Sequence, residues 1–132
     1  MPPRLRFTKA ERLKSRKQID RLFATGKAFS VFPVRTIYQF VPAEAGSLQV
    51  GVTASKKYFK RAVDRNRLKR LMREAYRLQK QELFLQVTEA KKTVSVFFIY
   101  TDKTIADFET VKAAMAKSLQ RLSKILQSET PS

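Results

Sequence analysis

The chain has 132 residues with 28 basic and 11 acidic side chains, which gives it a formal net charge of +17. Its length suits a single domain, residues 1–132, with one hydrophobic core. Because Cys and His are absent, disulfides, cysteine-based zinc sites and catalysis by a thiol or an imidazole base are excluded. So large a positive charge on one domain is typical of proteins that bind nucleic acid.

The apolar runs are all much shorter than the roughly 20 residues of a membrane span, and the first residues lead into charged ones. We therefore expect a cytoplasmic protein without a signal peptide. Residues 1–7 and 128–132 are polar or basic at the two ends, and we expect both segments to be flexible.

The first predicted helix runs from about Ser15 to Thr25. Ser15 and Gln18 form a capping-box pattern, although residues 8–11 offer a competing one. Gly26 follows as a natural residue for the position just after a helix.

Alternation with a period of two then predicts a strand over Phe29–Val41. One face of this strand would carry Phe32, Val34, Thr36, Tyr38 and Phe40. Pro33 favours an edge position or a bulge. After a turn at Pro42–Ser47, alternation over Leu48–Ala54 predicts a second strand, antiparallel to the first.

A basic helix is predicted from about Ala62 to Lys80, followed by a buried central strand over Val94–Tyr100. Asp107 is the expected N-cap of a last helix. That helix has an apolar stripe formed by Val111, Met115, Leu119, Leu122 and Leu126. The predicted order is αββαβα, an α+β two-layer sandwich with a βαβ crossover whose generic handedness is right-handed.

The positive charge is concentrated in two segments. Residues 56–80 hold eleven basic and two acidic side chains, and residues 1–27 hold nine basic and two acidic ones, so together they carry +16 of the +17. On a helical wheel, one face of the basic helix is apolar and would pack on the sheet. The other face carries Asn66, Lys69, Arg70, Arg73, Arg77 and Lys80, with Arg67 on its far flank. Lys56 and Lys57 extend this surface before the helix.

Arginine suits a phosphate-binding surface because its planar guanidinium donates two hydrogen bonds to one phosphate. Basic helices also bind membranes or acidic protein partners, and many charged faces are simply solvated. Those alternatives fit less well, because two strands bracket this helix and Glu74 is the main acid available for salt bridges along it.

Aromatic side chains beside the basic segments indicate a second candidate site. Phe23, Phe32, Tyr38 and Phe40 lie in or after the first helix, and such rings stack on unpaired bases. For each ring a place in the hydrophobic core is an equally good interpretation. Thr36 shares a face with Phe32 and Tyr38, so we expect part of that face to be wet.

The pattern over Lys56–Arg77 resembles the protein subunit of bacterial ribonuclease P. The resemblance rests on Ser55-Lys56-Lys57, Ala62-Val63, Arg65-Asn66-Arg67-Leu68-Lys69-Arg70 and Arg73-Glu74-Ala75-Tyr76-Arg77. Arg12-Leu13-Lys14 with Phe23 and Gly26, Leu48–Val52, and Asp107-Phe108 with Lys117 extend it over nearly the whole chain.

This resemblance implies an RNA-based endonuclease that removes the 5′ leader of precursor tRNA by magnesium-dependent hydrolysis. The RNA subunit would be the catalyst and would hold most of the Mg²⁺, while the protein would supply no catalytic residue and no metal ligand. It would bind ribonuclease P RNA and the leader without needing a membrane or a protein partner. The family fold also has a left-handed βαβ crossover, which we expect here in place of the generic right-handed one.

Two groups of contact residues follow from the resemblance. The RNA-subunit contacts would be Lys56, Lys57, Arg65, Asn66, Arg67, Lys69, Arg70, Arg73 and Arg77. The leader contacts would be Phe23, Phe32, Tyr38, Lys14 and Arg16. The chain departs from the family at Tyr58–Arg61, where the loop is one residue longer and lacks the usual glycine.

Two other functions fit the residues less well. A structural RNA-binding protein of the ribosomal kind would need no aromatic cleft. A nuclease acting through its own side chains would need paired acids on the basic face, and Asp and Glu are scattered instead.

Overall fold

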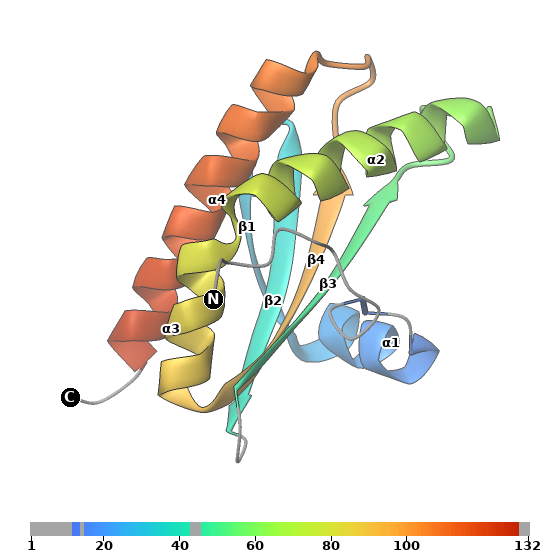
Figure 1. The fold of residues 1–132 in the computed structure, drawn as a ribbon. Coiled ribbons are helices and arrows are strands. Elements are labelled where there is room, and N and C mark those ends of the chain that lie inside the picture. The colour runs from blue at the N-terminus through green and yellow to red at the C-terminus, as the bar shows by residue number, and fades with distance from the viewer. Residues whose placement is uncertain (1–11, 14, 43–45, 130–132) are drawn as a thin grey trace.

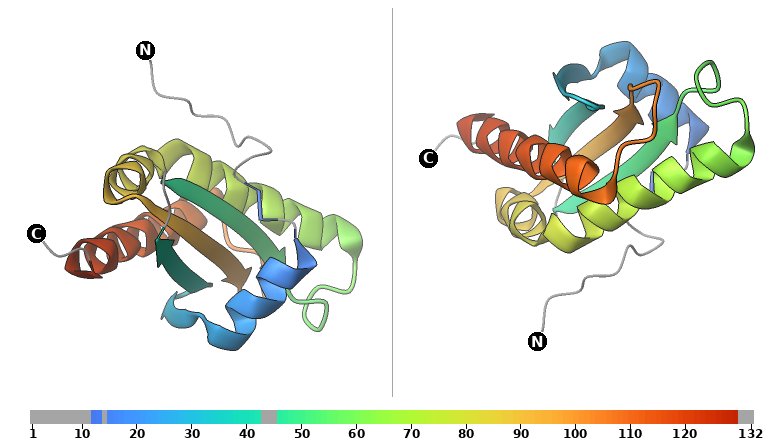
Figure 2. Two further views of the ribbon diagram at one scale, coloured as in Figure 1. Left: turned by 90° about the horizontal axis from the view of Figure 1, so that it is seen from below. Right: turned by 90° about the horizontal axis from the view of Figure 1, so that it is seen from above.

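The computed structural model describes residues 12–13, 15–42 and 46–129. Its helices are α1 (Arg16–Thr25), α2 (Ala62–Gln79), α3 (Gln81–Ala90) and α4 (Phe108–Glu129). Its strands are β1 (Lys27–Val31), β2 (Val34–Pro42), β3 (Ser47–Ala54) and β4 (Lys92–Tyr100), which form one four-stranded sheet. Helices α2, α3 and α4 cover one face of the sheet, and α1 lies against the other (Figures 1 and 2).

The α+β class is confirmed, but the order αββαβα lacked one strand and one helix. The predicted first strand is in fact a hairpin, β1 and β2, that turns at Phe32-Pro33, where the peptide bond is cis. This turn reverses the chain, so Phe29 pairs with Thr36 and packs on the same face of the sheet as Tyr38. Pro33 therefore sits in a turn, where a missing N–H costs no ladder hydrogen bond. The additional helix, α3, follows α2 directly and ends at Ala90, and its C-cap Lys91 has a left-handed φ of 54°.

The predicted antiparallel pairing of the two early strands is wrong. The sheet order is β1-β2-β4-β3, so β4 lies between β2 and β3. It pairs antiparallel with β2 and parallel with β3. A β3–β4 parallel pair requires a long crossover connection, which α2 and α3 supply. The left-handed sense of this connection stays a prediction.

Two predicted N-caps, Ser15 and Asp107, are confirmed by capping hydrogen bonds. The Ser15 hydroxyl accepts from the Gln18 N–H at the start of α1, and the Asp107 carboxylate accepts from the Thr110 N–H at 2.8 Å. The role of Gly26 differs from the expected left-handed cap, because its backbone is extended (φ −73°, ψ 161°). It is needed for space: a Cβ there would lie 2.5 Å from the Leu22 carbonyl oxygen and 3.0 Å from that of Tyr38.

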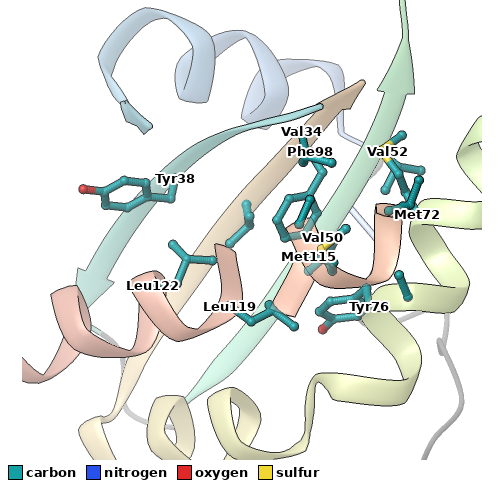
Figure 3. Close-up of a cluster of buried hydrophobic side chains, with 14 of the residues drawn as sticks. Val34, Tyr38, Val50, Val52, Met72, Tyr76, Phe98, Met115, Leu119 and Leu122 are labelled. Atoms are coloured by element: carbon teal, nitrogen blue, oxygen red, sulfur yellow. The ribbon is translucent and has the colours of Figure 1, made fainter. Parts of the chain in front are cut away.

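The main core lies between the sheet and helices α2, α3 and α4. The predicted stripe of α4 is buried throughout, and Figure 3 shows Met115, Leu119 and Leu122 beside Phe98 and Tyr76. A second, smaller cluster lies under α1 and consists of Leu13, Leu22, Ile37 and Phe97. None of the helices in the described ranges is long and apolar enough to span a membrane.

Candidate RNA-binding surface

Helix α2 presents its apolar face to the core and most of its basic residues to the surface, as the wheel predicted. Leu68, Met72, Ala75 and Tyr76 are buried. Asn66, Arg67, Arg70 and Arg73 are exposed, and Lys69 is partly exposed. Lys56 and Lys57 are exposed in the loop that leads from β3 into the helix. The structure therefore brings most of the predicted RNA-subunit contacts onto one side of α2 and its entry loop.

Three basic residues of this segment have other environments. Arg65 is only partly exposed, and its Nη1 donates to the carbonyl oxygens of Phe59 at 2.7 Å and Lys60 at 3.0 Å. Arg77 forms a bidentate ion pair with Glu74, with nitrogen–oxygen distances of 3.1 and 2.5 Å. That contact lowers the pKa of the Glu74 carboxyl and raises the pKa of Arg77.

Lys80 departs from the predicted cationic face altogether. Its side chain is buried, and its ammonium nitrogen lies 5.9 Å from the centre of the Tyr76 ring. A wheel extended to residue 80 fails here because α2 ends at Gln79 and the chain turns into α3.

Lys69 and Arg73 of α2 line a groove that also includes residues near α1. This cavity of about 450 Å³ lies between α1, the edge strand β3 and α2. It is lined by Arg12, Leu13, Ile19, Val50, Gly51, Val52, Thr53, Lys69, Arg73 and Phe97. Burial lowers the pKa of the Arg73 guanidinium, and the nearby positive charge of Arg12 lowers it further. The neighbouring guanidinium groups of Arg12 and Arg73 repel each other, and a bound anion would relieve that repulsion.

The floor of this groove is the sheet face under α1. Gly51 lies against Phe97, since a Cβ on Gly51 would be 3.2 Å from the edge of that ring. Phe23 of α1 packs against Phe97 with 5.3 Å between ring centres and a tilt of 51° between the ring planes, and 47% of Phe23 remains exposed. On the β3 side of the groove, the backbone at Leu13 is hydrogen-bonded to the strand: its N–H donates to the Val50 carbonyl at 3.0 Å.

The predicted aromatic trio is not brought together. Tyr38 lies on the opposite face of the sheet, buried among core residues near α4, with its ring 5.8 Å from Phe29 and 5.3 Å from Phe40 (Figure 3). On that face Val34, Thr36 and Tyr38 are buried and Phe40 is partly exposed. Phe32 is 72% exposed, but it lies in the hairpin turn beside a hollow lined by Asp107 and Lys117.

Arg16 is exposed at the first turn of α1, and Lys14 lies outside the described residues. Sequence reasoning missed Ile37 and Phe97, which form the sheet face under α1. A signal for Ile37 existed, because it alternates with Arg35 and Gln39 on the mixed polar and apolar side of the strand. Such a mixture is typical of a partly open sheet face.

Comparison with known proteins gives one consistent result. The family model described as Ribonuclease P matches residues 7–123. The ribonuclease P protein component of Porphyromonas gingivalis strain W83 is 41% identical over 122 residues, covering 92% of this chain and 89% of the relative. That of Chlorobium phaeobacteroides is 35% identical over 125 residues, covering 86% of each chain.

Two solved structures have the same fold. The RNase P protein of Staphylococcus aureus is 20% identical, with a TM-score of 0.63 over 89% of this chain and 99% of that one. The RNase P protein of Thermotoga maritima is 24% identical, with a TM-score of 0.64 over 84% of this chain and 96% of that one.

Proposed function

Because the chain belongs to the ribonuclease P protein family, we propose that it binds the catalytic RNA through α2 and the 5′ leader of precursor tRNA through the groove beneath α1. In this assignment the RNA subunit carries out the phosphodiester hydrolysis, and the protein holds the substrate near it. The observation that carries the proposal is the shared cavity, where Lys69 and Arg73 of α2 meet Arg12 and the Phe97 ring.

Each part of this surface suits one part of an RNA strand. Exposed arginines donate two hydrogen bonds to a single phosphate, and Asn66 adds both a donor and an acceptor. Unpaired bases stack on aromatic rings, and Phe23 offers an exposed ring supported by Phe97. A single strand crossing the groove would therefore meet Lys69 and Arg73 on the α2 wall and the Phe97 ring at the floor, with Phe23 next to that ring.

Magnesium is assigned mainly to the RNA subunit. Among the described residues, no three acidic side chains gather in a way that could hold a metal ion. The protein's contribution is to place positive charge near the phosphates. Bound basic side chains lower the repulsion between RNA strands, so less Mg²⁺ is needed for the same rate.

The test is the cleavage rate of precursor tRNA by the catalytic RNA at low Mg²⁺, measured with and without this chain. We expect a large stimulation that falls when the leader is shortened to one or two nucleotides. Tight RNA binding without stimulation would instead indicate a structural RNA-binding role. Binding should also be steeply salt-dependent, with a log–log slope of about −3.5 to −4.5 if about five phosphates are contacted.

A further inference from the structure

The loop between β3 and α2 carries an exposed aromatic ring that the groove does not include. Tyr58 is 41% exposed, whereas Tyr38, Tyr76 and Tyr100, the other tyrosines of the chain, are at most 7% exposed. Two ammonium nitrogens lie close to its ring, that of Lys57 at 5.9 Å and that of Lys103 at 5.8 Å from the ring centre. These contacts join a ring and two cations from two loops that are far apart in the sequence.

The sheet explains why the two loops meet. Strands β3 and β4 are parallel and in register, with Ala54 opposite Tyr100, so their carboxyl ends lie side by side. Lys57 and Tyr58 follow the first strand, and Lys103 follows the second. The carboxyl ends of adjacent parallel strands are a common place for ligand sites, because loops from both strands converge there.

Both loops are braced from within. Phe59 is buried next to Tyr100, with 5.9 Å between ring centres, and its N–H donates to the Ser55 carbonyl at 3.0 Å. The Tyr100 hydroxyl donates to the Thr104 carbonyl at 2.6 Å and accepts from the Ala106 N–H at 2.8 Å. Tyr100 thus braces the loop after β4 by hydrogen bonds and contacts the loop after β3 through the Phe59 ring, next in sequence to the exposed Tyr58.

The charge around this ring matches RNA. Residues 55–61 contain Lys56, Lys57, Lys60 and Arg61 and no acid. Ala62 then begins α2, whose free N–H groups add partial positive charge. An exposed ring surrounded by cations fits an unpaired nucleotide, because the base stacks on the ring while the lysines bind the flanking phosphates.

We propose that Tyr58, flanked by Lys57 and Lys103, is a stacking platform for one unpaired nucleotide of the catalytic RNA. This rests on the proposed function and adds a contact to it. The catalytic RNA is favoured as the source because the platform continues directly into α2, whose exposed Asn66 and Arg67 are assigned to that RNA. The leader groove, by contrast, opens beside α1.

A fluorescence experiment tests the stacking itself. The chain contains no Trp, so Tyr58→Trp in the full chain creates a single reporter that keeps an aromatic platform. We expect its emission to be quenched when the catalytic RNA is added. The matched control is Phe84→Trp on α3, which is 39% exposed and should be unaffected. Unchanged emission from the Tyr58→Trp variant while the complex forms would overturn the proposal. Quenching by precursor leader alone, and not by the catalytic RNA, would also overturn it.

Affinity measurements separate the ring from the charges. Stacking on one base corresponds to roughly a 5- to 150-fold effect on the dissociation constant. We therefore expect Tyr58→Leu to bind the catalytic RNA more weakly by a factor in that range and Tyr58→Phe to bind like the native chain. Lys103→Gln should lower the salt slope by about 0.7, whereas Lys124→Gln on α4 should not.

The outcomes distinguish this proposal from the one it rests on. If the native chain binds the RNA and stimulates cleavage while Tyr58→Leu binds equally well, the platform is refuted and the proposed function stands. If the native chain does not bind the RNA, both proposals fail. Urea denaturation of Tyr58→Leu, expected to match the native chain, shows that a lost affinity is not a lost fold.

Discussion

Arg65 and Arg67 lie two residues apart on α2, and replacing each by alanine should affect two different properties. The Arg65 guanidinium braces the β3–α2 loop through the Phe59 and Lys60 carbonyls, whereas Arg67 is exposed. We expect Arg65→Ala to lower the free energy of unfolding and Arg67→Ala to lower RNA affinity.

The magnitude for Arg65 follows from its contacts. A hydrogen bond from a charged donor contributes about 1.5–3 kcal/mol when shielded from water. The bond to Phe59 is partly buried and falls within this range, while the bond to Lys60 is exposed and adds little. Releasing the side chain regains about 1 kcal/mol of conformational entropy. The expected net loss for Arg65→Ala is about 0.5–2 kcal/mol, against less than about 0.5 kcal/mol for Arg67→Ala.

Urea denaturation and RNA binding at several salt concentrations measure both effects. A lower midpoint with an unchanged m-value reports a loss of stability alone. Arg67→Ala should reduce the salt slope by about 0.7 to 0.9, the value for one lost phosphate contact. Arg65→Lys keeps the charge and controls for long-range electrostatics. The reasoning is refuted if Arg65→Ala is as stable as the native chain but loses one unit of salt slope, since its guanidinium would then be bound to phosphate.

Four further substitutions test the packing and the capping. Phe23→Ala should weaken binding of a precursor with a long leader more than binding of one with a short leader. Tyr38→Ala should instead lower the free energy of unfolding by about 3–5 kcal/mol, because that ring is in the core. Equal effects of the two substitutions on leader binding would contradict the assignment of Phe23 to the leader. Gly26→Ala should cost about 1–3 kcal/mol, measured by urea denaturation, because its Cβ would collide with two carbonyl oxygens. The hydrogen bonds from Thr110 lower the pKa of Asp107, so its contribution to stability is present above the ordinary carboxyl pKa and is lost as the pH falls below it. Asp107→Asn keeps a capping side chain without this titration, so native and variant stabilities should converge at acidic pH.

The elements with strong local signals could be predicted from the sequence. Capping residues and apolar periodicity placed α1, α2 and α4, and a run of apolar residues interrupted only by Ser95 placed the central strand β4. The hairpin was missed because apolar residues occur on both sides of Pro33. The core-facing positions change from odd numbers in β1 (Phe29, Val31) to even numbers in β2 (Val34, Tyr38). Strand neighbours were missed because periodicity describes which face a residue occupies and carries no information about the partner strand.

The same limit applies to the candidate site. The cationic residues of α2 were found because their spacing alone places them on one face. The aromatic contacts depend on which side of the sheet α1 packs. Tyr38 and Ile37 are adjacent in sequence yet belong to opposite faces, and it is Ile37 that lies under α1. That choice is made by tertiary packing and has no local signature in the chain.

The apolar residues are divided unequally between the two faces of the sheet, and this division affects which elements open locally. Most of the apolar burial lies on the side of α2, α3 and α4, while α1 is held by a cluster of four buried residues. Elements with few buried contacts open at a lower free energy than the whole domain unfolds. We therefore expect amides of α1 to exchange with solvent well before those of β4.

A ligand that spans α1 and the sheet changes this order. Binding only the closed form stabilises it by mass action, so the added protection depends on ligand concentration. If the leader binds beneath α1 as proposed, we expect it to slow hydrogen exchange of the α1 amides more than that of the β4 amides.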